Sequence, residues 1–61
     1  MIMISVIVIT RNEEKNISRT LRSLKDRRIT EIIVSDSNSN DNTSRVVVLE
    51  AQKDKRIKIK S

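Results

Sequence analysis

Apolar residues fall into blocks along this chain, and polar segments separate the blocks. Residues 2–9, IMISVIVI, form an almost continuous β-branched run interrupted by one serine. This length and composition favour a strand over a helix, and near-continuous apolarity is typical of a central strand buried on both faces of a parallel sheet. We therefore expect such a strand near the N-terminus.

The next segment has the spacing of a helix. Ile17, Leu21 and Leu24 recur four and three residues apart, which places them on one helical stripe. Asn12 is a candidate N-cap, and the two glutamates after it would occupy the first turn, where the helix dipole favours anions. Basic residues gather where such a helix would end. The pattern predicts a helix over about residues 13–26.

A strand, a helix and another strand are predicted to follow. Residues 31–35, EIIVS, form a short apolar strand, and RIKIK at 56–60 alternates with period two, as a half-exposed strand does. The VVVL run between them favours a strand by propensity. Its flanks are polar, however, and Val46, Val47, Glu50 and Ala51 fit one face of a helix. We therefore prefer a helix that Asp41 or Thr43 caps and that runs to about residue 53.

This alternation indicates the α/β class, with a short parallel sheet and helical crossovers. Ligands of such sheets bind beyond the carboxyl ends of the strands. Polar clusters lie at two of these ends, TRNEE at 10–14 and SDSNSNDNT at 35–43. The two ends should lie side by side, so we expect Thr10, Asn12 and Asp36 to converge on one hollow.

The second cluster could be a calcium loop. Asp36, Asn38 and Asn40 match the opening of an EF-hand loop. The sixth position requires glycine and is Asp41, and the twelfth requires glutamate and is Val47. A strand also precedes the loop where a helix should. The calcium interpretation is therefore rejected.

A plain connector is the stronger alternative. Asn, Asp and Ser favour turns, and Asn38 or Asn40 can adopt the left-handed conformation that glycine would otherwise supply. This explains the residue types, but it does not explain a second polar cluster at the neighbouring strand end. A connector and one edge of a nucleotide pocket both stay open at this point.

Composition excludes several kinds of site. The chain has 61 residues, enough for one domain, and it contains no cysteine, histidine, glycine or aromatic residue. Disulfides and thiolate metal sites are excluded, the commonest general base is missing, and the glycine-rich phosphate loops have no counterpart. A domain of this size buries only about 60% of the surface that its unfolded chain exposes, so its stability is marginal.

The net charge is +5, which raises affinity for phosphates but also describes an ordinary charge-rich surface. No segment reaches the roughly 18 apolar residues of a membrane-spanning helix. The N-terminal apolar run has no basic residue before it and no cleavage site, so it does not indicate a signal peptide. We expect a cytoplasmic protein.

The polar clusters and the segments around them resemble family 2 glycosyltransferases. The stretches ISVIVITRNEEKNISRTLRSLKD, EIIVSDSNSNDNT and AQKDKRIKI are similar to the start of that family, where T-x-N-E-E precedes a helix and D-S-G-S-x-D-x-T follows the second strand. The likeness runs from about residue 3 to residue 60. It implies a Rossmann-like βαβαβ fold, the N-terminal portion of a GT-A domain, and a single partial nucleotide-sugar-binding domain over residues 1–61.

The resemblance also implies a binding site for a nucleotide-diphospho-sugar of the UDP or GDP type. Thr10 and Asn12 would border the base and ribose with Glu13 beside them, and Asp36 would lie at the nucleoside. The residues expected to bind the nucleotide-sugar are Thr10, Arg11, Asn12, Glu13, Asp36 and Ser37. Asp41 and Thr43 match the end of the second motif, where a helix-capping role is an equal alternative.

Three positions depart from the family pattern. Arg11 stands where many members have tyrosine, Ser37 replaces a second acid, and Asn38 replaces glycine, which requires a left-handed backbone there. The sequence contains no D-x-D, the family's metal and diphosphate motif. We therefore expect no metal site, cofactor or catalytic residue within this chain, with Mg²⁺ or Mn²⁺ expected only for the complete family enzyme.

The expected role is thus the donor-binding segment of an enzyme that transfers a sugar to an acceptor hydroxyl, with no transfer by this chain alone. The sequence does not name the sugar, base or acceptor. One alternative is a small basic protein that binds nucleic acid or another polyanion, and another is a remnant that folds poorly and binds nothing. An incomplete sheet would also leave an exposed edge that invites self-association.

Overall fold

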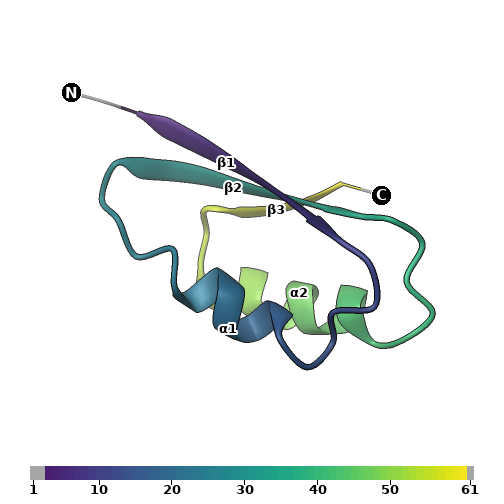
Figure 1. Ribbon diagram of the computed structural model, residues 1–61. Coiled ribbons are helices and arrows are strands. Elements are labelled where there is room, and N and C mark those ends of the chain that lie inside the picture. Colours follow the sequence, from purple (N-terminus) through teal and green to yellow (C-terminus); the bar gives the residue numbers. More distant parts are fainter. Residues whose placement is uncertain (1–2, 61) are drawn as a thin grey trace.

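The computed structural model describes residues 3–60, which form two layers, a parallel sheet and a pair of helices (Figure 1). The elements in chain order are β1 (Ile4–Thr10), α1 (Ile17–Arg22), β2 (Ile29–Asp36), α2 (Thr43–Lys53) and β3 (Ile57–Lys60). The α/β class and the predicted order of strands and helices are confirmed. Within the described residues, neither helix has the length and apolarity needed to cross a membrane.

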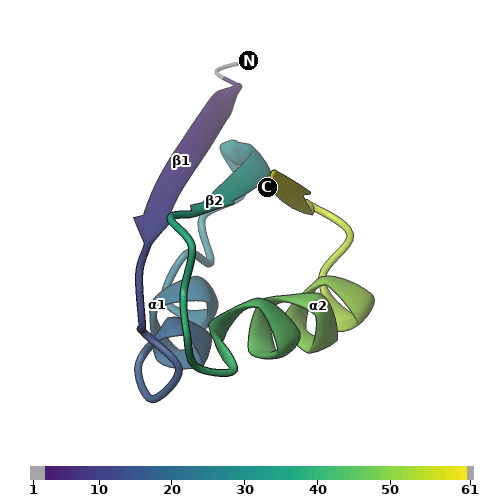
Figure 2. The ribbon, with the colours of Figure 1, turned by 90° about the vertical axis from the view of Figure 1, so that its right-hand side faces the viewer.

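The sheet has the order β1-β2-β3, and both pairs of strands are parallel. Thr10, the last residue of β1, lies opposite Asp36, the last residue of β2. Both helices cover the same face of the sheet (Figure 2). The carboxyl ends of β1 and β2 therefore meet at one edge, and the polar segments that follow them are neighbours.

The hydrophobic core lies between the sheet and the helices. Alternate side chains of a strand point to opposite faces, so only every second residue of the sheet reaches the helices. Fully or almost fully buried apolar side chains come from both layers: Ile17, Leu21, Ile32, Val34, Val47 and Ile57. Half-buried residues such as Val8 and Leu24 pack around them.

The prediction of a central first strand buried on both faces is wrong. In the sheet that residues 3–60 form, β1 is an edge strand, and the side chains of Ile7 and Ile9 are 67% and 77% exposed. Because both helices lie on one side of the sheet, the opposite face of β1 has no cover among residues 3–60. The predicted start of this strand at Ile2 lies outside the described residues.

Helix α1 is shorter than predicted at both ends. It begins at Ile17, with Asn16 as its N-cap. Asn12, the predicted N-cap, lies four residues before that position and has φ 52°, far from the helical value. The two glutamates therefore precede the helix and do not occupy its first turn. The helix ends at Arg22, β2 begins at Ile29, earlier than predicted, and the residues between them form the connector.

Helix α2 confirms the interpretation of the VVVL run. Val47 and Glu50 face the core and are buried, as the helical pattern requires. The N-cap is Asn42 rather than Asp41 or Thr43. The carboxylate of Asp41 nevertheless accepts the backbone N–H of Thr43 at 3.0 Å, so it satisfies one donor at the start of the helix.

The same short sequence, D-x-R-I, precedes both β2 and β3. In each copy the aspartate accepts the backbone N–H of the arginine two residues later, Asp26 from Arg28 at 2.8 Å and Asp54 from Arg56 at 3.0 Å. The guanidinium of each arginine also donates a hydrogen bond to the carboxylate of the same aspartate. This local turn redirects the chain from the helix layer into the sheet.

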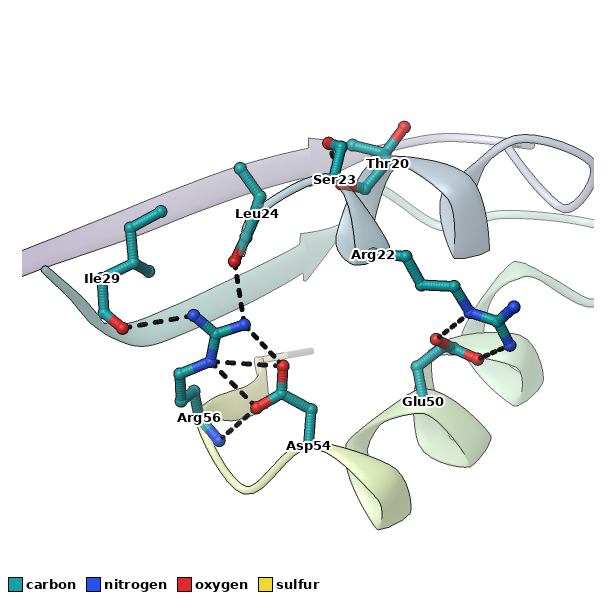
Figure 3. A network of polar contacts seen from close by, with 8 residues as sticks. All are labelled: Thr20, Arg22, Ser23, Leu24, Ile29, Glu50, Asp54 and Arg56. Carbon is teal, nitrogen blue, oxygen red and sulfur yellow. Dashed lines mark hydrogen bonds and ion pairs between the residues drawn. The ribbon is translucent and has the colours of Figure 1, made fainter. Parts of the chain in front are cut away.

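The second turn also reaches other elements, as Figure 3 shows. The Arg56 guanidinium donates to the carbonyl oxygens of Leu24 at 2.9 Å and Ile29 at 3.2 Å. Arg22 of α1 donates from Nε to Glu50 of α2 at 3.1 Å (Figure 3). Two arginines thus connect the end of α1 and the start of β2 to the C-terminal part of the fold.

Candidate functional site

The site begins with a contact between the last residues of β1 and β2. The hydroxyl of Thr10 donates a hydrogen bond to Asp36 Oδ1 at 2.8 Å. Thr10 is 2% exposed, so its side chain orients Asp36 from a buried position and offers little surface to a ligand. The predicted convergence of Thr10 and Asp36 is present, and it follows directly from the parallel register.

The Asp36 carboxylate is held by four donors. Besides Thr10, the hydroxyl and the backbone N–H of Ser39 donate to it, the latter at 3.0 Å, and the Ser44 hydroxyl lies at 3.5 Å from Oδ2. These bonds, chiefly those from Ser39, lower the pKa of Asp36 below its ordinary value. The group is therefore an anion at neutral pH with a fixed orientation.

Asn12 joins the loop after β1 to the loop after β2. Its backbone N–H donates to Ser39 Oγ at 2.8 Å, and its Oδ1 accepts the backbone N–H of Asn40 at 2.8 Å. Asn12 therefore contacts the same serine that holds Asp36. The structure brings Asn12 to the Asp36 loop, with its amide oxygen already used in that contact.

The two loops are tied again at their far ends. The backbone N–H of Glu13 donates to Thr43 Oγ1 at 2.9 Å, and that of Glu14 donates to Asp41 Oδ2 at 3.3 Å. The carboxylate of Glu14 accepts two hydrogen bonds from Asn42, each at 3.3 Å. This reciprocal bonding explains why both loops are rich in oxygen-bearing side chains.

Two asparagines take the conformation that glycine usually supplies. Asn12 has φ 52° and Asn38 has φ 56°, both in the left-handed region. Asn is tolerated there better than most residues because its short polar side chain bonds locally. The left-handed backbone expected at Asn38 is confirmed.

The other predicted site residues lie at the surface of these loops. Arg11, Glu13 and Ser37 are exposed. Glu13 takes part in the loop contact through its backbone, which leaves its carboxylate at the surface. The predicted residues thus form two groups. Thr10, Asn12 and Asp36 are held by hydrogen bonds within and between the loops, and Arg11, Glu13 and Ser37 are exposed around them.

A hollow of about 280 Å³ opens beside Asp36, between the carboxyl ends of β2 and β3. Of the residues expected to bind the nucleotide-sugar, only Asp36 lines this hollow, and the expected convergence of Thr10 and Asn12 on it is not found. The strand predicted at 56–60 ends at this same edge and could have indicated the contribution of β3. The residues that line it are Asp36, Asn38, Ser39, Ser44, Ile59 and Lys60. The hollow therefore combines a fixed anion, hydroxyl and amide groups, one apolar side chain and one cation.

The donor set does not fit a divalent metal. Within residues 3–60, no group of three Asp, Glu, His or Cys side chains is placed to hold an ion. The best-placed carboxylates are already engaged, Asp36 by Thr10 and Ser39 and Asp41 by Thr43 and the Glu14 N–H. Magnesium and manganese prefer free carboxylate oxygens, so no reaction step through a metal is assigned to these residues.

Comparison with known proteins gives one match. The model of the family described as Glycosyl transferase family 2 matches residues 5–61. No curated protein and no solved structure matches the chain. Three parallel strands with two helices agree with the Rossmann-like N-terminal portion of a GT-A domain. On the match over nearly its whole length, the chain belongs to glycosyl transferase family 2.

Proposed function

We propose that the hollow beside Asp36 binds the nucleoside part of a nucleotide-diphospho-sugar, the donor of a sugar-transfer reaction. The observation that carries this proposal is the Asp36 carboxylate, an oriented anion at the carboxyl edge of a parallel sheet in a family 2 chain. Ligands of such sheets bind at this edge. The hollow is near the lower end of the range of ligand sites, roughly 300–1000 Å³, so it suits part of a ligand.

Asp36 has the chemistry to recognise a base. An ionised carboxylate only accepts hydrogen bonds and has about four lone-pair positions. Thr10 and Ser39 use three of them, and the longest bond, from Ser44 at 3.5 Å, is the one that a ligand can replace. A ring N–H of uracil or guanine supplies the required donor.

A cation that lines the hollow suits the diphosphate. Lys60 lines the hollow with Asp36, and the exposed Arg11 follows β1 at the same edge. A nucleotide carries base donors at one end and phosphate oxygens at the other, so it matches an anion and a cation in one site. A simple polyanion gains nothing from Asp36, because its phosphates are repelled there.

In this proposal the chain binds the donor and does not transfer the sugar by itself. None of these 61 residues is proposed to hold Mg²⁺ or Mn²⁺ or to activate an acceptor hydroxyl. Binding should therefore be independent of added manganese. UDP- and GDP-linked sugars are the donors to compare, since the geometry of Asp36 suits either base.

The proposal is tested by titrating the chain with UDP, GDP and their sugar conjugates, with and without manganese, while recording amide chemical shifts. We expect weak binding that shifts the amides of residues 36–44 and 59–60. Replacement of the carboxylate in Asp36→Asn should weaken binding roughly tenfold, the loss of one charged hydrogen bond. The matched control is Asp26→Asn, a carboxylate in the turn before β2, at the opposite end of the sheet.

Lys60→Ala provides a second variant that leaves the loop contacts of Asp36 intact. It should weaken binding of nucleotides but not of the free nucleoside, because only the phosphate is affected. Binding that falls steeply with salt, accepts any polyanion and is equal in the Asp36 and Asp26 variants would favour the polyanion-binding alternative. Absence of any shift at millimolar nucleotide would contradict the proposal.

A further inference from the structure

Ser39 donates hydrogen bonds to both oxygens of the Asp36 carboxylate. Its hydroxyl donates to Oδ1, and its backbone N–H donates to Oδ2 at 3.0 Å. One residue therefore occupies one acceptor position on each oxygen. The remaining positions are approached by Thr10, which donates to Oδ1 at 2.8 Å, and by Ser44, whose hydroxyl lies 3.5 Å from Oδ2.

The two oxygens of Asp36 differ in what they can still accept. An ionised carboxylate has about two lone-pair positions on each oxygen. Both positions of Oδ1 are used, by Thr10 and Ser39, and Thr10 is too deeply buried for a ligand to take its place. Oδ2 has one firm bond, from the Ser39 N–H, and one long contact with Ser44. A ligand therefore finds one replaceable position on Asp36, and it lies on Oδ2.

The Ser39 hydroxyl is itself held in place. The backbone N–H of Asn12 donates to Ser39 Oγ at 2.8 Å, so the serine oxygen accepts from the loop after β1 while its own hydrogen is donated to Asp36. These bonds join residues 10–44 to one another, and they do not depend on what surrounds the sheet. The occupation of Oδ1 is therefore a property of the two loops themselves.

Uracil and guanine offer different donors to a carboxylate. Uracil has one ring N–H between two carbonyls, whereas guanine has a ring N–H next to an amino group. Two parallel N–H groups bind a carboxylate through one position on each oxygen. Asp36 has no such position left on Oδ1, so it can accept the ring N–H of either base but leaves the guanine amino group without a partner on this carboxylate.

We propose that Ser39 is a specificity-determining residue, whose hydroxyl closes Oδ1 so that Asp36 binds a base with a single ring N–H, such as uracil, in preference to guanine. This inference rests on the proposed binding of the nucleoside at Asp36. A donor that leaves water without gaining an acceptor weakens binding. The discrimination therefore acts through the unpaired amino group of guanine, and the bond to the ring N–H is common to both bases.

Inosine and guanosine monophosphates test the proposal. They share the ribose, the phosphate and the ring N–H, and they differ only in the 2-amino group of guanine, so the size of the base does not affect the comparison. Titrations that follow the amide chemical shifts of residues 36–44 give a dissociation constant for each nucleotide. We expect the inosine nucleotide to bind roughly threefold to tenfold more tightly, the effect of one donor left without a partner.

The variant Ser39→Ala vacates the position on Oδ1 and keeps the backbone N–H on Oδ2. The preference for the inosine nucleotide should disappear, because the amino group of guanine then has an acceptor. Ser44→Ala is the matched control, since it removes a serine hydroxyl from the other oxygen. It should change the affinity for the two nucleotides alike and keep their ratio. Ser39→Thr retains a hydroxyl and should retain the preference.

A measurement without nucleotide tests the bond itself. The Ser39 hydroxyl is the largest cause of the lowered pKa of Asp36, and the Ser44 hydroxyl is the smallest. The carboxyl carbon of Asp36, followed by NMR as the pH is lowered, should therefore titrate at a higher pH in Ser39→Ala than in the unmodified chain. The change in Ser44→Ala should be smaller, and equal changes in the two variants would show that Ser39 does not close Oδ1.

Equal affinity of the unmodified chain for the two nucleotides would overturn the proposal, and so would an unchanged ratio in Ser39→Ala. Either result leaves nucleoside binding at Asp36 standing, because both nucleotides still bind. Absence of binding by either nucleotide instead contradicts the proposed function, and this inference with it. Far-ultraviolet circular dichroism shows whether each variant is folded. If Ser39→Ala is unfolded, the ratio of affinities in the unmodified chain decides the outcome by itself.

Discussion

Two asparagines determine how the loops of this glycine-free chain turn. Asn12 and Asn38 both adopt a left-handed backbone. Both are neighbours of Ser39, which donates to Asp36: Asn12 is hydrogen-bonded to Ser39, and Asn38 precedes it in the chain. Other L-residues pay roughly 1–2 kcal/mol for this conformation. The loops therefore depend on residue type at these two positions more than on the polarity of the segment as a whole.

At Asn38 we expect replacement to follow backbone preference. Asn38→Ala should lower the free energy of unfolding by about 1 kcal/mol, because alanine disfavours a positive φ, whereas Asn38→Gly should be close to neutral. Urea denaturation measures both. Ser37→Ala, next to it and exposed, is the control with a small effect. Equal losses for the alanine and glycine variants at Asn38 would contradict this explanation.

At the scale of elements, the two D-x-R-I turns have different roles despite the same local geometry. The side chain of Arg28 bonds only within its own turn among the described residues, whereas that of Arg56 also donates to the carbonyls of Leu24 and Ile29. Those carbonyls belong to the end of the α1 segment and the start of β2. The second turn thus ties three parts of the fold together.

Arg56→Lys should therefore destabilise the protein, since an ammonium cannot reproduce the planar fork that bonds two carbonyls and a carboxylate. We expect a loss of about 1–2 kcal/mol in the free energy of unfolding, the value of one or two hydrogen bonds. Arg28→Lys makes the same chemical change in the other turn and should lower the unfolding midpoint less, because only the bonds to Asp26 within that exposed turn are affected. Thermal and urea unfolding of the two variants give the comparison, and equal shifts would show that the contacts to Leu24 and Ile29 do not contribute.

At the scale of the whole molecule, anions stabilise a fold whose net charge is positive. Hydrogen bonds lower the pKa of Asp36, Asp41 and Asp54, and Arg22 lowers that of Glu50. The partner of Asp26 is Arg28, whose bonds lower the pKa of that carboxyl to about 2. These groups lie in both loops, both turns and the contact between the helices.

Stability should consequently fall in acid. A carboxylate with a lowered pKa binds protons less readily when folded than when unfolded, so its contribution is complete above the ordinary value and is lost as pH falls through the folded value. The ordinary values are 3.8 for Asp and 4.5 for Glu, so the loss should begin below about pH 4.5 and continue towards pH 2. Loss of anions also increases the repulsion among the 13 cationic side chains.

Urea midpoints between pH 7 and pH 2 measure this dependence. Asp41→Asn should flatten part of the profile, because its carboxylate ties the two loops through the N–H groups of Glu14 and Thr43. Lys15→Gln, an exposed change elsewhere, should leave the shape unaltered. A stability that is constant from pH 7 to pH 2 would contradict the proposed role of these carboxylates.

The order of elements and part of the site could be predicted from sequence because both depend on local patterns. Helix α2 followed from the spacing of Val47 and Glu50, and the contact of Thr10 with Asp36 followed from placing two parallel strand ends side by side. The limits of α1 could not be predicted, because the segment after Asn12 bonds to a loop about 30 residues away, and no local pattern carries that information.

What the amino-acid sequence by itself determined is the alternation of strands and helices, the parallel sheet and the family, since periodicity and motif spacing are properties of the chain. Only the tertiary structure decided which faces are covered. An apolar run such as that of β1 looks the same whether one face or two are buried, and placing both helices on one side left Ile7 and Ile9 exposed. Likewise, Lys60 joined Asp36 in one hollow only because β3 lies beside β2.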